Sequence, residues 1–137
     1  MGKGVILSSS RKQKQNSRSS TEAELIAADD VVPQILWTQL FLEAQGYPMK
    51  HVLNQDNQSA ILLETNGKAS SSKRTRHFNI RFFYIKDQID RGLITVRYCP
   101  TEEMLADFFT KPMQGEKFRT FRGWVMGHTT PEHSLVI

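Results

Sequence analysis

Three acidic residues stand at positions from which they could bind divalent cations. Glu24 lies early in an expected helix, Asp56 follows a short apolar segment, and Asp107 follows a later one. Carboxylate oxygens are preferred ligands of Mg²⁺. Two such ions about 4 Å apart activate a water and stabilise the leaving oxygen of a phosphodiester. The three residues are therefore candidates for metal-dependent hydrolysis of a nucleic acid.

Each of these residues also has an explanation that involves no metal. Glu24 could complete a capping box at the start of its helix. Asp56 could cap the helix that follows it, and Asp107 could be an ordinary surface acid. The spacing is not a specific code, so both interpretations stay open on the residues alone.

The segments around these acids predict alternating strands and helices. Apolar and β-branched runs predict strands at 5–9, 51–55 and 93–98. Pro33 is expected to kink or break a helical pattern, because proline lacks the amide hydrogen and clashes with the preceding turn. Helices are expected at 20–32, 34–45, 57–67, 77–91, from Thr101 onward, and at 115–125. The alternation favours an α/β fold with parallel strands, whose functional residues gather at strand C-termini such as Asp56.

Composition limits the class of protein. The 137 residues suit one domain, with 39% hydrophobic and 23% charged residues. One cysteine excludes an intrachain disulfide and favours a reducing compartment. No uninterrupted apolar run approaches the length of a membrane helix, so no membrane partner is expected.

Basic residues form three clusters in a chain of net charge +4. Such clusters suit phosphate contacts without sequence preference, although any one of them could be a solvated face. Their members are Arg11, Lys12, Lys14 and Arg18; Lys68, Lys73, Arg74, Arg76 and Arg81; and Lys111, Lys117, Arg119 and Arg122.

Four sequence blocks, taken in order, resemble the ribonuclease H domain of copia-type LTR retrotransposon Pol polyproteins. The resemblance covers roughly residues 5–122, and the blocks are specific only in combination. They are SSSRKQ at 8–13 with SSTEAE at 19–24, QDNQSAI at 55–61, KRTRHFNIR at 73–81, and LADFFTKP at 105–112.

This resemblance implies a ribonuclease H-like fold, a mixed sheet flanked by helices. It implies hydrolysis of the RNA strand of RNA–DNA hybrids by two Mg²⁺ ions held on four carboxylates, with Mn²⁺ as a substitute. Glu24, rather than its neighbour Glu22, matches the helix glutamate of that set. Asp56 and Asp107 match two of its aspartates.

The resemblance also implies partners and further binding residues. The expected partners are the RNA–DNA hybrid and the reverse transcriptase domain of the same polyprotein, in a cytoplasmic virus-like particle. Contacts to the hybrid are expected from Ser20, Asn57, Gln58, Lys73, Arg74 and Arg76.

One departure from the family pattern concerns the first aspartate. The family carries it on an opening strand between the second strand and the strand ending at Asp56, and no aspartate precedes Asp29 here. We therefore expect an incomplete domain over 1–126 that lacks the first two strands, a disordered tail over 127–137, and weak or no activity for the isolated chain. A non-catalytic nucleic-acid-binding remnant and a non-functional gene fragment are the alternatives, and an unrelated helical interaction protein leaves the ordered blocks unexplained.

Overall fold

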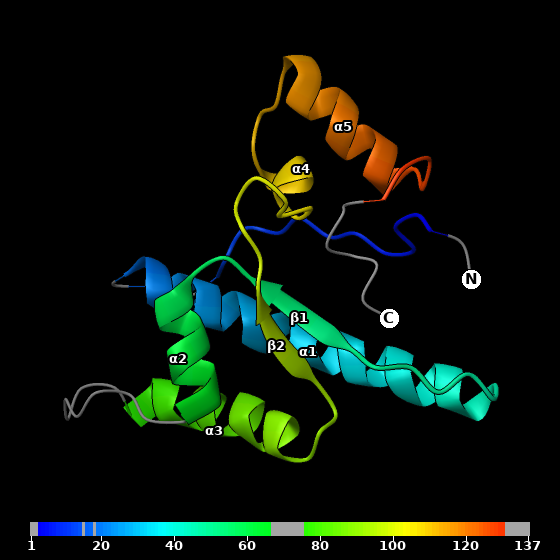
Figure 1. The fold of residues 1–137 in the computed structure, drawn as a ribbon. Helices are drawn as coiled ribbons and strands as arrows, with labels where there is room; N and C mark the ends of the chain where they lie inside the picture. The colour runs from blue at the N-terminus through cyan, green and yellow to red at the C-terminus, as the bar shows by residue number, and fades with distance from the viewer. Residues whose placement is uncertain (1–2, 15, 18, 67–75, 131–137) are drawn as a thin grey trace. The chain divides into compact units, whose positions relative to one another are not determined.

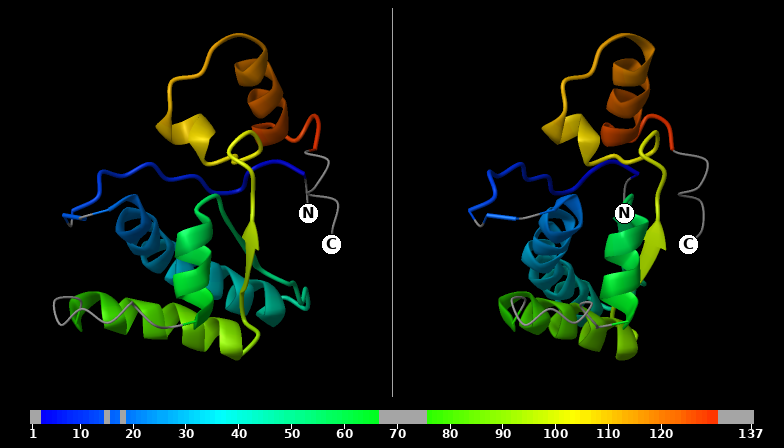
Figure 2. Two further views of the ribbon diagram at one scale, coloured as in Figure 1. Left: turned by 60° about the vertical axis from the view of Figure 1, so that its left-hand side comes forward. Right: turned by 90° about the vertical axis from the view of Figure 1, so that its left-hand side faces the viewer.

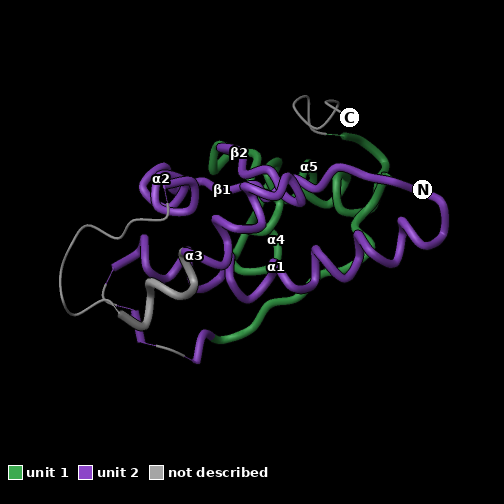
Figure 3. The backbone as a smooth tube through the Cα atoms, turned by 90° about the horizontal axis from the view of Figure 1, so that it is seen from below, with its two compact units in different colours: residues 1–12, 99–137 green, residues 13–98 purple. Residues whose placement is uncertain are grey.

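A computed structural model describes residues 3–14, 16–17, 19–66 and 76–130, with the side chains of 76–82 left out. These residues form two compact units, 13–98 and 1–12 with 99–137, which are described separately (Figure 3). The single domain predicted over 1–126 stays a prediction, and most of the predicted tail lies outside the described residues. The elements are α1 (Ser20–Ala44), β1 (Val52–Gln55), α2 (Gln58–Asn66), α3 (Arg76–Asp90), β2 (Thr95–Tyr98), α4 (Asp107–Thr110) and α5 (Gly115–Val125) (Figure 1).

The larger unit is built on a small parallel sheet. β1 pairs with β2, and Leu53 lies opposite Val96. The helices α1, α2 and α3 lie on one side of this pair (Figure 2). The predicted α/β class, the parallel pairing and both strand positions are confirmed.

One face of the sheet closes the core of the larger unit. Ile94 is buried and Leu53 packs against the core, whereas Val52 on the other face is exposed. Along α1 the buried side chains recur every three or four residues, which places them on one face of the helix. The buried core cluster consists of Leu25, Ala28, Val32, Ile85 and Ile94.

A break at Pro33 is wrong, whereas the alternative of a bend there stays a prediction. α1 runs without interruption from Ser20 to Ala44 with Pro33 inside it. Proline in a helix costs about 3 kcal/mol, largely through the lost hydrogen bond and a steric clash. Pro33 is exposed, so solvent reaches the helix at the position where the proline offers no amide hydrogen. Buried Val32 and the core-packed Leu36 hold the helix on both sides of the proline, and tertiary packing outweighs the local penalty.

We expect Pro33→Ala to stabilise the protein by about 1 kcal/mol. The alanine restores an amide donor to the helix, while loss of the proline's restraint on the unfolded chain offsets part of the gain. Urea denaturation measures the change. Asp30→Ala, at an exposed position of the same helix, controls for alanine's general helix preference. A Pro33→Ala protein no more stable than the wild type would contradict the explanation.

The smaller unit corrects two further expectations. Residues 5–9 form no strand; the amide of Val5 instead donates to the carbonyl of Val125 at 2.9 Å. The polar residues that follow Leu7 leave no alternating apolar face for a sheet. Thr101 does not cap a helix, because it lies in a turn and α4 begins at Asp107. The predicted helix at 115–125 is confirmed as α5.

By length and composition alone, α1 could span a membrane, with a mean hydropathy of 1.2 over its most apolar window. A third of that window is buried inside the protein, and core helices of soluble proteins meet the same criteria. One such helix is a weak indication. The expected absence of a membrane partner therefore stays a prediction.

Candidate functional site

The first turn of α1 places Glu24 on the core-facing side of the helix. The predicted cap is confirmed, since Ser19 Oγ accepts the amide of Glu22 at 3.1 Å. Glu24 is half-buried and lies one turn before Ala28, a member of the buried core. The choice of Glu24 over Glu22 as the candidate ligand stays a prediction.

The turn between β1 and α2 carries Asp56. Asn57 caps α2, since its Oδ1 accepts the amides of Ser59 at 3.0 Å and Ala60 at 3.1 Å. The capping role offered for Asp56 is therefore taken by its neighbour. The buried side chain of Gln55 accepts a hydrogen bond from the amide of Asn57 at 3.1 Å and so stabilises the turn. Asp56 is left half-buried just beyond the end of the strand.

One long-range contact joins these two segments. Asn57 Nδ2 donates to Thr21 Oγ1 at 3.5 Å, across 36 positions of sequence. The turn that carries Asp56 therefore lies against the first turn of α1, three residues before Glu24. Two of the three candidate ligands belong to the same end of the larger unit.

A fourth carboxylate, which was not predicted from the sequence, belongs to the same end of the larger unit. Glu64 on α2 is 0% exposed, and neither of its carboxyl oxygens has a hydrogen-bond partner among the described residues. Burial raises the pKa of Glu64 from 4.5 to about 7; the adjacent Gln55 amide lowers it, and the charge of Glu24 raises it further. Glu64 is thus close enough to Glu24 for their charges to interact.

Asp107 is the third candidate ligand and belongs to the smaller unit. It is only 6% exposed, and Lys111 Nζ lies 2.8 Å from its Oδ2. The buried carboxylate therefore has a cationic partner one helical turn away. Among the residues that the structure describes, no three His, Cys, Asp or Glu side chains come together. Convergence of Asp107 with Glu24 and Asp56 stays a prediction.

The predicted nucleic-acid contacts are only partly described. Ser20 and Gln58 are exposed, at the first positions of α1 and α2. Lys73 and Arg74 lie outside the described residues, and of Arg76 only its place at the start of α3 is described.

Comparison with known proteins finds relatives that are similar in sequence to most of this chain. A retrovirus-related Pol polyprotein from transposon TNT 1-94 of Nicotiana tabacum is 34% identical over 127 residues, 92% of this chain and 9% of that protein. The corresponding polyprotein from transposon RE2 of Arabidopsis thaliana is 32% identical over 88% of this chain and 8% of its own length. The homologues of this chain are retrotransposon Pol polyproteins.

The similarity extends to a more distant member of this group. The Gag-Pol polyprotein of transposon Ty1-NL2 of Saccharomyces cerevisiae is 28% identical over 84% of this chain and 7% of that protein. The chain thus spans less than a tenth of the length of these relatives. No protein-family model matches it, and no solved structure does either.

Proposed function

We propose that this chain is part of a ribonuclease H-like domain of a copia-type retrotransposon Pol polyprotein, and that this domain hydrolyses the RNA strand of RNA–DNA hybrids. The observation that carries the proposal is the Thr21–Asn57 contact. It brings the helix turn of one candidate metal ligand, Glu24, against the strand end of another, Asp56. The Pol polyprotein relatives give this pair its context.

The arrangement of the larger unit supports the proposal. In parallel α/β sheets, functional residues collect beyond the carboxyl ends of the strands. Asp56 follows the end of β1, and Ser20 and Gln58 are exposed at the starts of neighbouring helices. Exposed polar side chains beside a pair of carboxylates are suited to contact a backbone with 2′-hydroxyls.

Divalent ions fit the residues of this end of the unit. Glu24 and Asp56 supply the oxygen ligands that Mg²⁺ and Mn²⁺ prefer. The carboxyl of Glu64 has no hydrogen-bond partner among the described residues, and it adds negative charge near them above its raised pKa of about 7. Asp107 stays the third expected ligand, and within the smaller unit Lys111 Nζ lies 2.8 Å from its Oδ2. When bound, two such ions activate water and stabilise the leaving oxygen.

The test is hydrolysis of a labelled RNA–DNA hybrid in Mn²⁺. We expect slow cleavage by the wild type, at least a tenfold loss in Asp56→Asn and in Glu24→Gln, and no loss in Asp30→Asn. Asp30 is an exposed carboxylate on the same helix as Glu24, which makes it a matched control. Cleavage that survives both candidate substitutions would refute the assignment.

A second candidate function is nucleic-acid binding without catalysis. It is favoured by the three clusters of basic residues, which suit phosphate contacts without any catalytic group. On this alternative, the wild type and both variants bind the hybrid equally, and none of them cleaves it.

Hybrid affinity is expected to depend on Lys73, Arg74 and Arg76. Replacing all three with alanine should weaken binding and flatten its dependence on salt, because each lost phosphate contact removes roughly 0.9 from the slope of log K against log salt. Fluorescence anisotropy at several salt concentrations measures this slope. An unchanged slope would remove these residues from the proposed interface.

The remaining proposals concern the surroundings of the domain. We place it beside the reverse transcriptase domain of the same polyprotein, within a cytoplasmic virus-like particle. Both proposals follow from the Pol relatives.

A further inference from the structure

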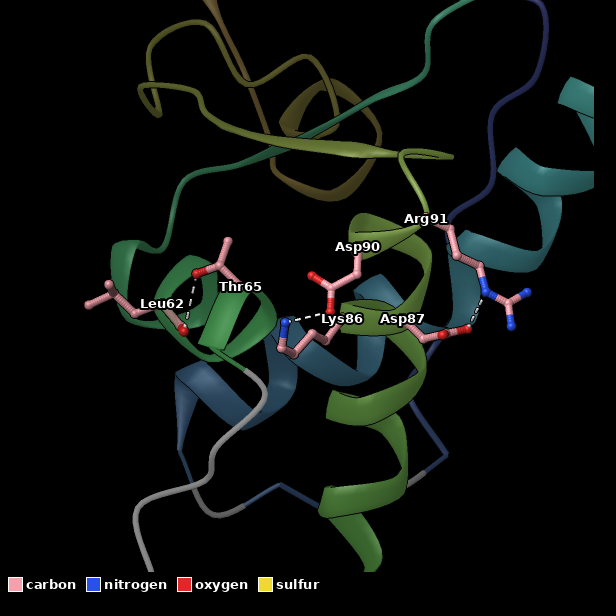
Figure 4. Close-up of polar contacts among 6 residues, drawn as sticks. All are labelled: Leu62, Thr65, Lys86, Asp87, Asp90 and Arg91. Carbon is pink, nitrogen blue, oxygen red and sulfur yellow. Dashed lines mark hydrogen bonds and ion pairs between the residues drawn. The ribbon is translucent and has the colours of Figure 1, made fainter.

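Glu64 has an environment unlike that of the acids on α3. There, Asp90 pairs with Lys86 at 2.6 Å and Asp87 pairs with Arg91 at 3.0 Å, both near the surface (Figure 4). Glu64 is fully buried and has no such partner among the described residues. A buried carboxylate is costly unless a cation or hydrogen-bond donors accompany it.

The polar side chains on neighbouring positions are engaged in other hydrogen bonds. Thr65, the next residue of α2, donates its hydroxyl to the carbonyl of Ile61 at 2.8 Å and approaches that of Leu62 (Figure 4). Lys86 is engaged by Asp90. The Gln55 side chain lies beside Glu64 and lowers its pKa, but its Oε1 accepts the amide of Asn57.

A second carboxylate, that of Glu24, belongs to the same end of the larger unit as Glu64. The Thr21–Asn57 hydrogen bond sets the first turn of α1, just before Glu24, against the start of α2, and the charge of Glu24 raises the pKa of Glu64. Two adjacent carboxylates repel each other when both are ionised. A divalent cation between them removes this repulsion and the cost of burial together.

We propose that Glu64 and Glu24 together bind one divalent cation. The site is new because Glu64 is not among the carboxylates that the family resemblance supplies. The inference rests on the proposed function only in that Glu24 belongs to both sites. The cation site adds the carboxylate of Glu64 to the end of the larger unit that carries Glu24 and Asp56. It therefore binds a cation before any nucleic acid binds.

The experiment measures Mn²⁺ binding by the full chain without nucleic acid. Bound Mn²⁺ is followed by the loss of the free-ion electron paramagnetic resonance signal at about pH 7.5, above the raised pKa of a buried glutamate. Glu64→Gln and Glu24→Gln are each expected to weaken binding at least tenfold. Glu43→Gln, which changes an exposed glutamate of α1, is expected to leave binding unchanged.

A thermal melt of each protein separates loss of the site from loss of the fold. We expect Glu64→Gln to melt cooperatively but to lose the Mn²⁺-dependent rise in melting temperature that the wild type shows. No Mn²⁺ binding by the wild type at millimolar concentrations overturns the proposal. Unchanged binding in either Glu64→Gln or Glu24→Gln also overturns it.

These outcomes are independent of hydrolysis. If the chain binds Mn²⁺ through Glu64 but cleaves no hybrid, the cation site stands and the proposed nuclease function fails. If it cleaves the hybrid and Glu64→Gln binds Mn²⁺ normally, the nuclease function stands and the cation site fails.

Discussion

Replacing Glu64 with glutamine is expected to stabilise the protein by about 3 kcal/mol at pH 8 in the absence of divalent cations. Burial raises the pKa of Glu64 from 4.5 to about 7. Raising a pKa by one on folding costs about 1.4 kcal/mol once the group is ionised in both states. Between these two pH values the folded protein holds a proton that the unfolded chain has released. Stability therefore falls as the pH rises through this range, and above pH 7 the full cost is present.

The glutamine variant separates this effect from other titrations. It is neutral at every pH, so its advantage over the wild type should be full at pH 8 and close to zero at pH 4.5. For a chain of 137 residues, the difference at pH 8 corresponds to a rise in melting temperature on the order of 10 °C. Glu43→Gln serves as the exposed control and should show no such trend. An advantage that is equal at both pH values would contradict the argument.

Adding a divalent cation should affect the wild type and Glu64→Gln differently. If Mn²⁺ binds Glu64 and Glu24, it stabilises the wild type more than the variant. The gap at pH 8 should therefore narrow as Mn²⁺ is added.

Local sequence signals predicted those features of the fold that depend on local chemistry. The caps at Ser19 and Asn57 depend on a side-chain oxygen next to free helix amides, which the sequence makes visible. The strands β1 and β2 follow short apolar runs bounded by polar residues. In each case the interaction partners lie within a few positions of one another.

Features that depend on tertiary packing were missed or mistaken. Pro33 has a strong local penalty, but the helix around it is held by core residues from other elements. Val5 belongs to a short apolar run, yet its partner is the carbonyl of Val125 rather than another strand. Neither competing interaction can be read from neighbouring residues.

Glu64 shows the same limit within the candidate site. The available signal was its spacing, because Glu64 stands one turn after the buried Ala60 on the same face of α2. That spacing indicates an acid directed toward the core. Its closeness to Glu24 depends on the packing of α2 against α1, which local periodicity does not specify.

The largest gain in activity is expected from adding a strand beside β1. In the described part of the chain β1 pairs only with β2, so its other edge is unpaired. Unpaired edges favour aggregation and non-native pairing. The family resemblance implies a strand at this edge that carries a further aspartate for the metal site of Glu24 and Asp56.

The test joins the chain to the segment that precedes the aligned region in the tobacco polyprotein. Three proteins are compared: the chain, the fusion, and the fusion with the added aspartate changed to asparagine. Both fusions should melt at higher temperature than the chain, because pairing of the β1 edge does not need the carboxylate. Only the fusion with aspartate should gain hybrid cleavage, on the order of 100-fold, since the added carboxylate gives Glu24 and Asp56 a further oxygen ligand for divalent ions. If the chain alone melts cooperatively and cleaves as fast as the fusion, then neither the unpaired edge of β1 nor the added aspartate matters for stability or cleavage. A rise in stability without any rise in cleavage would support the strand and reject the aspartate's role.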